Sequence, residues 1–137
     1  MPPSNKFDWQ RSLETFLVAN PMVDAGRKSL FATLGLGFGH VREVWDLRYG
    51  VDRKQQLDLY FPAGRAPLAA LAFVHGGGWR TGDKNEYRYL GRALAQRGYA
   101  VAVIGYRLFP QVHFPGFVHD VAQACIYLRE NNARVGW

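Results

Sequence analysis

The alternation of apolar and polar positions predicts two neighbouring β-strands in the middle of the chain. Residues 41–49 and 55–61 both alternate, with a polar turn between them. The second segment has an apolar side and a polar side, made by Leu57, Leu59 and Phe61 against Asp58 and Tyr60. Alternation of this kind is typical of antiparallel strands with one buried and one solvated face. We therefore expect an antiparallel pair with one solvent-exposed face.

Two unbroken apolar runs follow, and a helical pattern separates them. Residues 68–74 and 99–104 contain almost no polar side chain, which is typical of strands buried on both faces of a parallel sheet. Between them, Asp83 and Glu86 have the spacing of a capping box, and the helical pattern runs to about Arg97 before Gly98. Strand, helix and strand within this length predict a right-handed parallel βαβ unit.

Helical periodicity also marks both ends of the chain. Residues 7–19 and 23–34 predict two short helices, and residues 116–131 predict a longer one. The apolar stripe of the longer helix consists of Val118, Val121, Ala122, Cys125 and Leu128. We therefore divide the chain into an N-terminal helical, cap-like segment at 1–40 and an α/β core at 41–137.

Composition narrows the classes of partner. The 137 residues suffice for one domain, and the net charge of +6 is scattered over the sequence without a long basic run, so we expect no nucleic-acid partner. Cys125 is the one cysteine, which excludes an internal disulfide and a cysteine metal cluster. Without an apolar leader or an apolar stretch of spanning length, we expect no membrane span and a cytoplasmic location.

The first apolar run leads into His75-Gly76-Gly77-Gly78-Trp79, the segment most informative about chemistry. Glycines at a strand-to-helix turn permit positive φ, and exposed N–H groups there can hold an oxyanion. Residues 77–84 also approach the phosphate-loop pattern, but Asp83 stands where that loop needs lysine. The glycine cluster at 35–39 follows a helix rather than a strand, so a helix stop explains it better than a dinucleotide loop.

Several motifs together extend this loop into a family pattern: Leu57-Asp58-Leu59-Tyr60-Phe61-Pro62, Phe73-Val74 before the glycine loop, Gly82-Asp83-Lys84, Tyr106-Arg107-Leu108, and Phe114-Pro115 before Asp120. In this order they resemble the α/β-hydrolase superfamily, in its carboxylesterase and arylformamidase-like branch. The implied fold is α/β: the N-terminal half of an α/β-hydrolase sheet, with antiparallel first strands and then the parallel βαβ unit, after two short helices.

The resemblance also implies an activity and a set of roles. The activity is hydrolysis of a small-molecule ester or aryl amide by acyl transfer to water, without a cofactor or a metal. Gly77 and Gly78 would donate N–H groups to the oxyanion, and His75, Gly76 and Trp79 would support the loop, with Trp79 beside the acyl pocket or in the core. Arg107 and Asp120 would form a partly buried structural pair. Asp83 is expected to be a helix cap, Cys125 a buried filler, and His113 and His119 loop and helix-face residues.

The catalytic triad is missing from this pattern. The three serines, Ser4, Ser12 and Ser29, precede the matching region, and none lies in a G-x-S-x-G nucleophile elbow. We therefore expect the chain alone to be a truncated, catalytically incomplete hydrolase. A C-terminal half as a separate chain, or a homo-oligomer, would cover the open sheet edge. The alternative is a non-catalytic binding or regulatory module on a hydrolase scaffold.

Overall fold

A computed structural model describes residues 16–18 and 40–135 of the chain. The strands are β1 (Phe16–Val18), β2 (Val41–Arg48), β3 (Gln56–Pro62), β4 (Ala70–Val74) and β5 (Ala100–Ile104). The helices are the 3-10 turn η1 (Lys84–Tyr87), α3 (Arg88–Gln96), α4 (Gly116–Glu130) and the short α5 (Asn132–Val135). The four strands and two long helices expected between residues 41 and 131 are therefore present.

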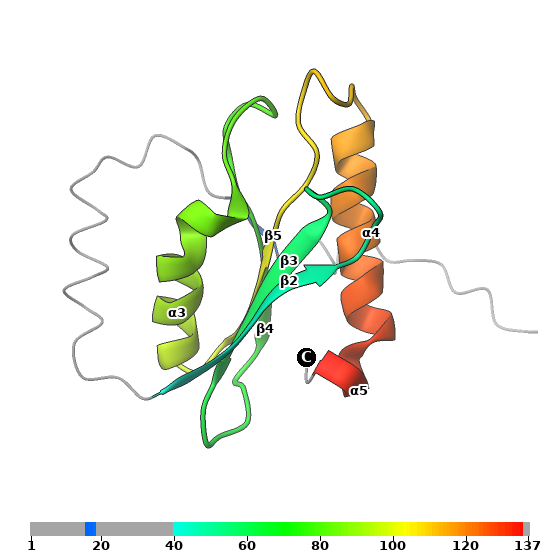
Figure 1. The fold of residues 1–137 in the computed structure, drawn as a ribbon. Coiled ribbons are helices and arrows are strands. Elements are labelled where there is room, and N and C mark those ends of the chain that lie inside the picture. Colours follow the sequence, from blue (N-terminus) through cyan, green and yellow to red (C-terminus); the bar gives the residue numbers. More distant parts are fainter. Residues whose placement is uncertain (1–15, 19–39, 136–137) are drawn as a thin grey trace, which may run out of the picture.

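The strands form one mixed sheet in the order β1-β4-β5-β3-β2. β2 pairs antiparallel with β3, β3 pairs antiparallel with β5, and β4 lies parallel to β5 with Ala70 opposite Ala100. Helix α3 covers one face of the sheet and α4 covers the other, as Figure 1 shows. This confirms the α/β fold, with antiparallel strands first and a parallel βαβ unit after them.

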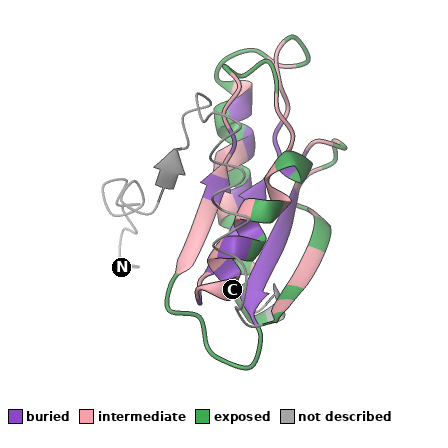
Figure 2. Ribbon diagram, turned by 90° about the vertical axis from the view of Figure 1, so that its left-hand side faces the viewer, coloured by how far each residue is buried: buried purple, intermediate pink, exposed green. Residues whose placement is uncertain are grey.

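Two hydrophobic clusters lie on opposite faces of the sheet. One packs Leu57, Leu59 and Ile104 against Ala124 and Leu128 of α4. The other packs Tyr60, Phe73, Val101 and Val103 against Ala95 of α3. Strand β5 is buried along its whole length, whereas the edge strand β2 mixes half-buried and exposed residues (Figure 2).

The expectation of a solvent-exposed face on the strand pair is wrong for β3. Asp58 and Tyr60, on its polar side, are both fully buried, as are Leu57 and Leu59 on its apolar side. The alternation itself is correct, because the two sides belong to different hydrophobic clusters. Sequence could not show that β5 would pair with β3 and place it inside the sheet, under a helix on each face.

The expected stripe of α4 is correct at Leu128, but its other buried positions are displaced by one residue. The buried residues are Phe117, Asp120, Ala124 and Leu128, whereas Val118 is 42% exposed. Cys125 is half-buried and packs against the cluster below α4. The displacement arises because a buried ionised residue, Asp120, occupies a place on the inner face that a hydrophobic pattern assigns to an apolar side chain.

Part of the N-terminal expectation can be compared with the structure. Residues 16–18, expected within a helix over 7–19, instead form strand β1, which runs parallel to β4 with Phe16 opposite Ala72. A strand edge has unpaired N–H and C=O groups, and pairing of a short extended segment satisfies them. The helix over 23–34 and the rest of 7–19 lie outside the described residues.

Candidate active site

The glycine loop leaves the carboxyl end of β4 and reaches η1 through Asp83. Gly77 and Gly78 have φ of 128° and 61°, a region that favours glycine. The carbonyl of Gly77 accepts hydrogen bonds from the N–H groups of Arg80 and Thr81, each at 3.1 Å, which closes a tight turn. A Cβ atom on Gly77 would overlap the carbonyl oxygen of Thr81 and lie 2.7 Å from its carbon. The turn therefore requires glycine at position 77.

The N–H groups of Gly77 and Gly78 have no hydrogen-bond acceptor within residues 40–135. Gly78 is exposed and Gly77 is half-buried. Two successive free N–H groups at the carboxyl end of a strand, just before a helix, can bind an anion. Among the described residues, these two N–H groups, which the family resemblance assigns to an oxyanion, are therefore left without an internal partner.

His75 is buried inside the base of this loop. Its ring stacks between Tyr106, with centroids 4.4 Å apart, and Tyr87, at 5.9 Å. Nδ1 donates to the carbonyl of Gly76 at 2.9 Å, which places a proton on that nitrogen. Burial lowers the pKa of His75, against an opposing contribution from this hydrogen bond. A neutral, stacked imidazole is suited to holding the loop in place.

Tyr106 completes the support at the start of the loop. Its hydroxyl donates to the backbone carbonyl of His75 at 2.6 Å, and burial raises the pKa of Tyr106 to about 12. The hydroxyl therefore stays protonated and remains a donor through the neutral pH range. Gly82 returns the chain to the same ring, since a Cβ there would lie 2.5 Å from His75 Nδ1.

Trp79 lies at the surface rather than in the core. It has φ of 64°, is 42% exposed, and stacks on Phe117 of α4 with centroids 4.5 Å apart and planes 8° apart. Its carbonyl accepts from Phe109 N at 2.8 Å. The stacking and the hydrogen bond tie the glycine loop to the segment that leads into α4.

Arg107 and Asp120 form a bidentate ion pair. Arg107 Nη2 lies 2.6 Å from Asp120 Oδ1, and Arg107 Nε lies 2.9 Å from Oδ2. The backbone N–H of Arg107 and the side-chain amide of Gln55 also donate to this carboxylate, which is 1% exposed. Burial would raise the pKa of Asp120, but these hydrogen bonds outweigh it and hold the pKa below its usual value.

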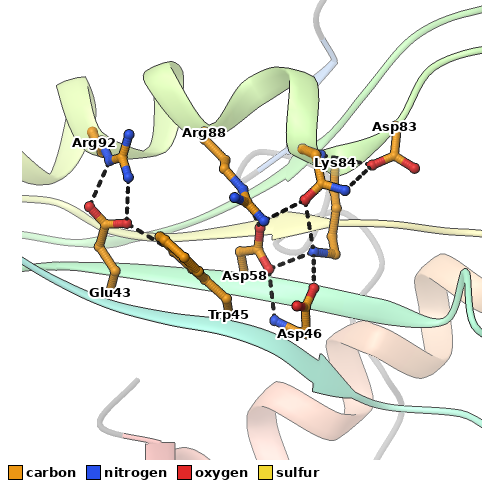
Figure 3. A network of polar contacts seen from close by, with 9 residues as sticks. Glu43, Trp45, Asp46, Asp58, Asp83, Lys84, Arg88 and Arg92 are labelled. Atoms are coloured by element: carbon orange, nitrogen blue, oxygen red, sulfur yellow. Dashed lines mark hydrogen bonds and ion pairs between the residues drawn. The ribbon is translucent and has the colours of Figure 1, made fainter.

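The residues that the sequence reasoning missed are the buried lysine and its carboxylates. Lys84 Nζ lies 2.6 Å from Asp46 Oδ1 and 2.7 Å from Asp58 Oδ1, as Figure 3 shows. Hydrogen bonding from Lys84 lowers the pKa of Asp46. The available signal was Asp58 within an apolar strand, but only the position of β3 inside the sheet makes that carboxylate require a cation.

Asp83, the residue before Lys84, caps η1. Its carboxylate accepts from Asn85 N at 2.9 Å and pairs with Lys54 at 2.9 Å. Burial raises the pKa of Asp83, yet these hydrogen bonds leave it lowered overall. His113 lies in the loop before α4, and His119 lies on an exposed position of α4. Neither residue is brought to the glycine loop by a contact that the structure records.

A cavity of about 300 Å³ opens beside the loop's base rather than beneath its tip. Its lining is polar and comes from the β2–β3 turn, the ends of β4 and β5, and η1: Arg53, Lys54, Gln56, His75, Asp83, Lys84, Asn85 and Gly105. Gly77, Gly78 and Trp79 do not line it. Across the described ranges no group of three or more histidine, cysteine or acidic residues is arranged to hold a metal, and none of the helices has the length and apolarity to cross a membrane.

The sheet order, the glycine loop at the end of β4 and the paired Arg107–Asp120 define an α/β-hydrolase of the carboxylesterase type, and comparison with known proteins agrees. The chain belongs to the BD-FAE family, whose model matches residues 57–136.

Curated relatives include esterases and formamidases. A "Probable isoprenylcysteine alpha-carbonyl methylesterase" of Oryza sativa subsp. japonica is 43% identical over 89 residues, which cover 64% of this chain and 21% of the relative. A kynurenine formamidase of Danio rerio is 30% identical over 84 residues, covering 61% of this chain and 29% of that protein. The chain thus spans about a fifth to three tenths of the length of these relatives.

Solved structures show the same likeness. Esterase B from Lactobacillus rhamnosis is 32% identical with a TM-score of 0.60, and the match covers 75% of this chain and 35% of that one. The same esterase, in a structure inhibited by a tributyrin phosphonate, gives a TM-score of 0.61.

Proposed function

We propose that the Gly77 and Gly78 N–H groups bind the oxyanion formed during hydrolysis of a carboxylic ester or an aryl amide. The observation that carries the proposal is a pair of N–H groups that have no acceptor among residues 40–135, in a turn that requires glycine at position 77 and follows the carboxyl end of β4. The names of the esterase and formamidase relatives support a carbonyl substrate bearing an alkoxy or amino leaving group.

The chemistry assigned to the loop is electrostatic. When a nucleophile attacks the substrate carbonyl, the carbonyl electron pair moves to oxygen, and two N–H dipoles stabilise that charge. When the pair returns, the leaving group departs and the acyl group passes to the nucleophile and then to water. One oxyanion donor contributes about 10²–10³ in kcat. No cofactor is needed for such a step.

Other residues would act on the loop rather than on the substrate. His75, stacked between two tyrosines, fixes the start of the loop, Gly76 accepts its hydrogen bond, and Trp79 fastens the loop to α4. Arg107 and Asp120 hold the segment after β5 against α4. In the same proposal, residues 41–137 are the N-terminal part of a hydrolase core, and residues 1–40 form a cap-like segment.

The proposed hydrolysis also needs a nucleophile, which the motifs recognised in this chain do not include. None of Ser4, Ser12 and Ser29 stands in a G-x-S-x-G sequence. We propose that the 137 residues alone do not hydrolyse esters, and that turnover requires a segment carrying the nucleophile elbow, in the same polypeptide or as a second chain.

The test measures hydrolysis of p-nitrophenyl acetate and of formanilide, with and without such a segment. Turnover is expected in its presence and should fall roughly 10²–10³-fold in Gly77→Ala. Gly64→Ala is the matched control, because Gly64 also has positive φ, at 75°, but lies in an open turn with nothing within 4 Å of a Cβ. Equal losses in the two variants would contradict the role of the loop.

Two further outcomes bear on the proposal. Clear turnover by the 137 residues alone would show that the incomplete-site proposal is wrong. If no ester or amide is hydrolysed even with the elbow segment present, the alternative of a non-catalytic binding or regulatory module becomes the better account.

A further inference from the structure

An ionic cluster of Asp46, Asp58 and Lys84 lies directly beyond the end of the glycine loop, with Lys84 and Asp58 buried and Asp46 exposed. The Lys84 side chain is 6% exposed and the Asp58 side chain is 0% exposed, so both charges have left water. Asp58 Oδ1 also accepts from the backbone N–H of Asp46 at 2.9 Å. A buried charge without a partner is costly, so each of these two ions depends on the other for its place in the fold.

The cluster joins the sheet to the segment that follows the glycine loop. Both carboxylates come from the sheet, Asp58 from β3 and Asp46 from the bulge in β2, where its φ is 56°. The cations come from the segment that follows the loop: Lys84 opens η1, and Arg88 opens α3 with Nε 3.8 Å from Asp58 Oδ2. Figure 3 shows Lys84 reaching from this segment down to the two strands.

The loop is therefore held at two ends. Its start is fixed by His75, whose carbonyl accepts from Tyr106 and whose ring lies between two tyrosines. Its end is fixed by Lys84, two residues after Gly82, whose backbone packs against the His75 ring too closely for a Cβ. Between these points the Gly77 carbonyl closes the turn, and Trp79 adds a contact with Phe117 of α4.

We propose that Lys84 is a positioning residue that fixes the end of the oxyanion loop to the sheet through Asp58 and Asp46, and thereby sets the direction of the Gly77 and Gly78 N–H groups. The catalytic meaning of this role rests on the function proposed above, but the anchoring itself does not. Lys84 touches no reacting atom. Its effect passes along the backbone from Lys84 to Gly77.

Another ion pair provides a matched control. Arg92 donates to Glu43 at 2.7 and 3.0 Å and so also ties α3 to β2, but its side chain is 47% exposed and it lies one turn beyond Arg88 on the helix, away from the loop. Losing it removes a connection between α3 and the sheet without touching η1 or the end of the loop. If Lys84 served stability alone, loss of the Lys84 ion pair would affect the loop no more selectively than loss of the Arg92 ion pair.

The test records amide spectra of the chain labelled with [15N]glycine, for the wild type, Lys84→Met, Lys84→Arg and Arg92→Gln. Lys84→Met is expected to shift and broaden the signals of Gly76, Gly77, Gly78 and Gly82, while those of Gly64 and Gly98 stay in place. Arg92→Gln should leave all six signals unmoved, and Lys84→Arg should restore part of the wild-type pattern because it retains the charge.

Two results would overturn the proposal. A folded Lys84→Met chain with unchanged loop signals would show that the lysine serves stability alone. Shifts spread equally over the loop and the distant glycines would show the same. If Lys84→Met does not fold, Asp46→Asn decides. This variant removes one of the two carboxylate partners of Lys84 Nζ and keeps Asp58, so smaller shifts confined to the same loop glycines are expected, and unmoved loop signals would overturn the proposal.

Catalysis provides a second readout. In the form of the protein that hydrolyses p-nitrophenyl acetate, Lys84→Met should lower kcat roughly a hundredfold with little change in KM, since a displacement of about 1 Å has that effect on positioned groups. Absence of turnover in the wild type would contradict the proposed function, and the glycine spectra would still decide whether Lys84 anchors the loop.

Discussion

Replacement of Gly91 by alanine tests whether tertiary packing overrides helix propensity. Gly91 lies inside α3, where alanine is intrinsically favoured over glycine by about 1 kcal/mol. By that rule alone Gly91→Ala stabilises the protein. In the structure, however, a Cβ on Gly91 would overlap the ring of Tyr60, with Cε2 only 2.5 Å away.

The ring has little room to retreat. Tyr60 is fully buried in β3, and its side chain packs with Phe73, Val101 and Val103 beneath α3. Overpacking a well-filled core costs about 1–3 kcal/mol, and the short approach to a rigid ring favours the upper part of that range. After the gain in propensity, we expect Gly91→Ala to lower the free energy of unfolding by about 1–2 kcal/mol.

Urea unfolding monitored by circular dichroism measures this change in the free energy of unfolding. An unchanged m-value would show that the folded and unfolded states of the variant remain comparable with those of the parent. Tyr60→Leu is the second variant of a double-mutant cycle. In that background the ring is gone, so Gly91→Ala should become neutral or stabilising. A wild-type-background Gly91→Ala more stable than the parent, or an unchanged cost in the Tyr60→Leu background, would refute the packing argument.

Two further predictions concern ionisable side chains. Because the pKa of Asp120 is lowered in the folded state, its ionised form contributes stability above the unfolded value of 3.8, and this contribution is lost as the pH falls through the folded pKa. The free-energy gap between wild type and Asp120→Asn, measured by urea unfolding across pH 2–7, should therefore narrow below about pH 4, and a gap that widens in acid would contradict this sign. Burial raises the pKa of the half-buried Cys125 thiol, so iodoacetamide should alkylate the folded chain at neutral pH more slowly than the urea-unfolded chain, and equal rates would show that the thiol is not protected.

The local elements of the core followed from sequence because their causes are local. Alternation along residues 56–62, the apolar run ending at Val74 and the cap residue Asp83 each depend on neighbours within a few positions. The glycine loop could also be predicted, because three successive glycines between a strand and a helix are typical of a tight turn with positive φ. Its ends, from Val74 to Lys84, are where these signals predicted them.

Two of the errors share one cause, which is that burial depends on distant partners. Asp58 was expected at a solvated face, and Val118 was expected on the buried stripe of α4. The structure buries Asp58 under Lys84 and exposes Val118, because Asp120 turns inward to Arg107 and Gln55. Hydrophobic patterns assign polar residues to water, so they miss polar residues that are buried with a partner from elsewhere in the chain.

By itself, the sequence determined the class of this protein: the order of strands and helices after residue 40, the glycine loop and the motifs that place it among α/β-hydrolases. Tertiary structure alone decided how the loop is held. His75 between two tyrosines, Gly82 against the His75 ring and Lys84 on Asp58 are contacts across strands and helices. Such contacts arise from sheet order and helix placement, and no short-range pattern encodes them.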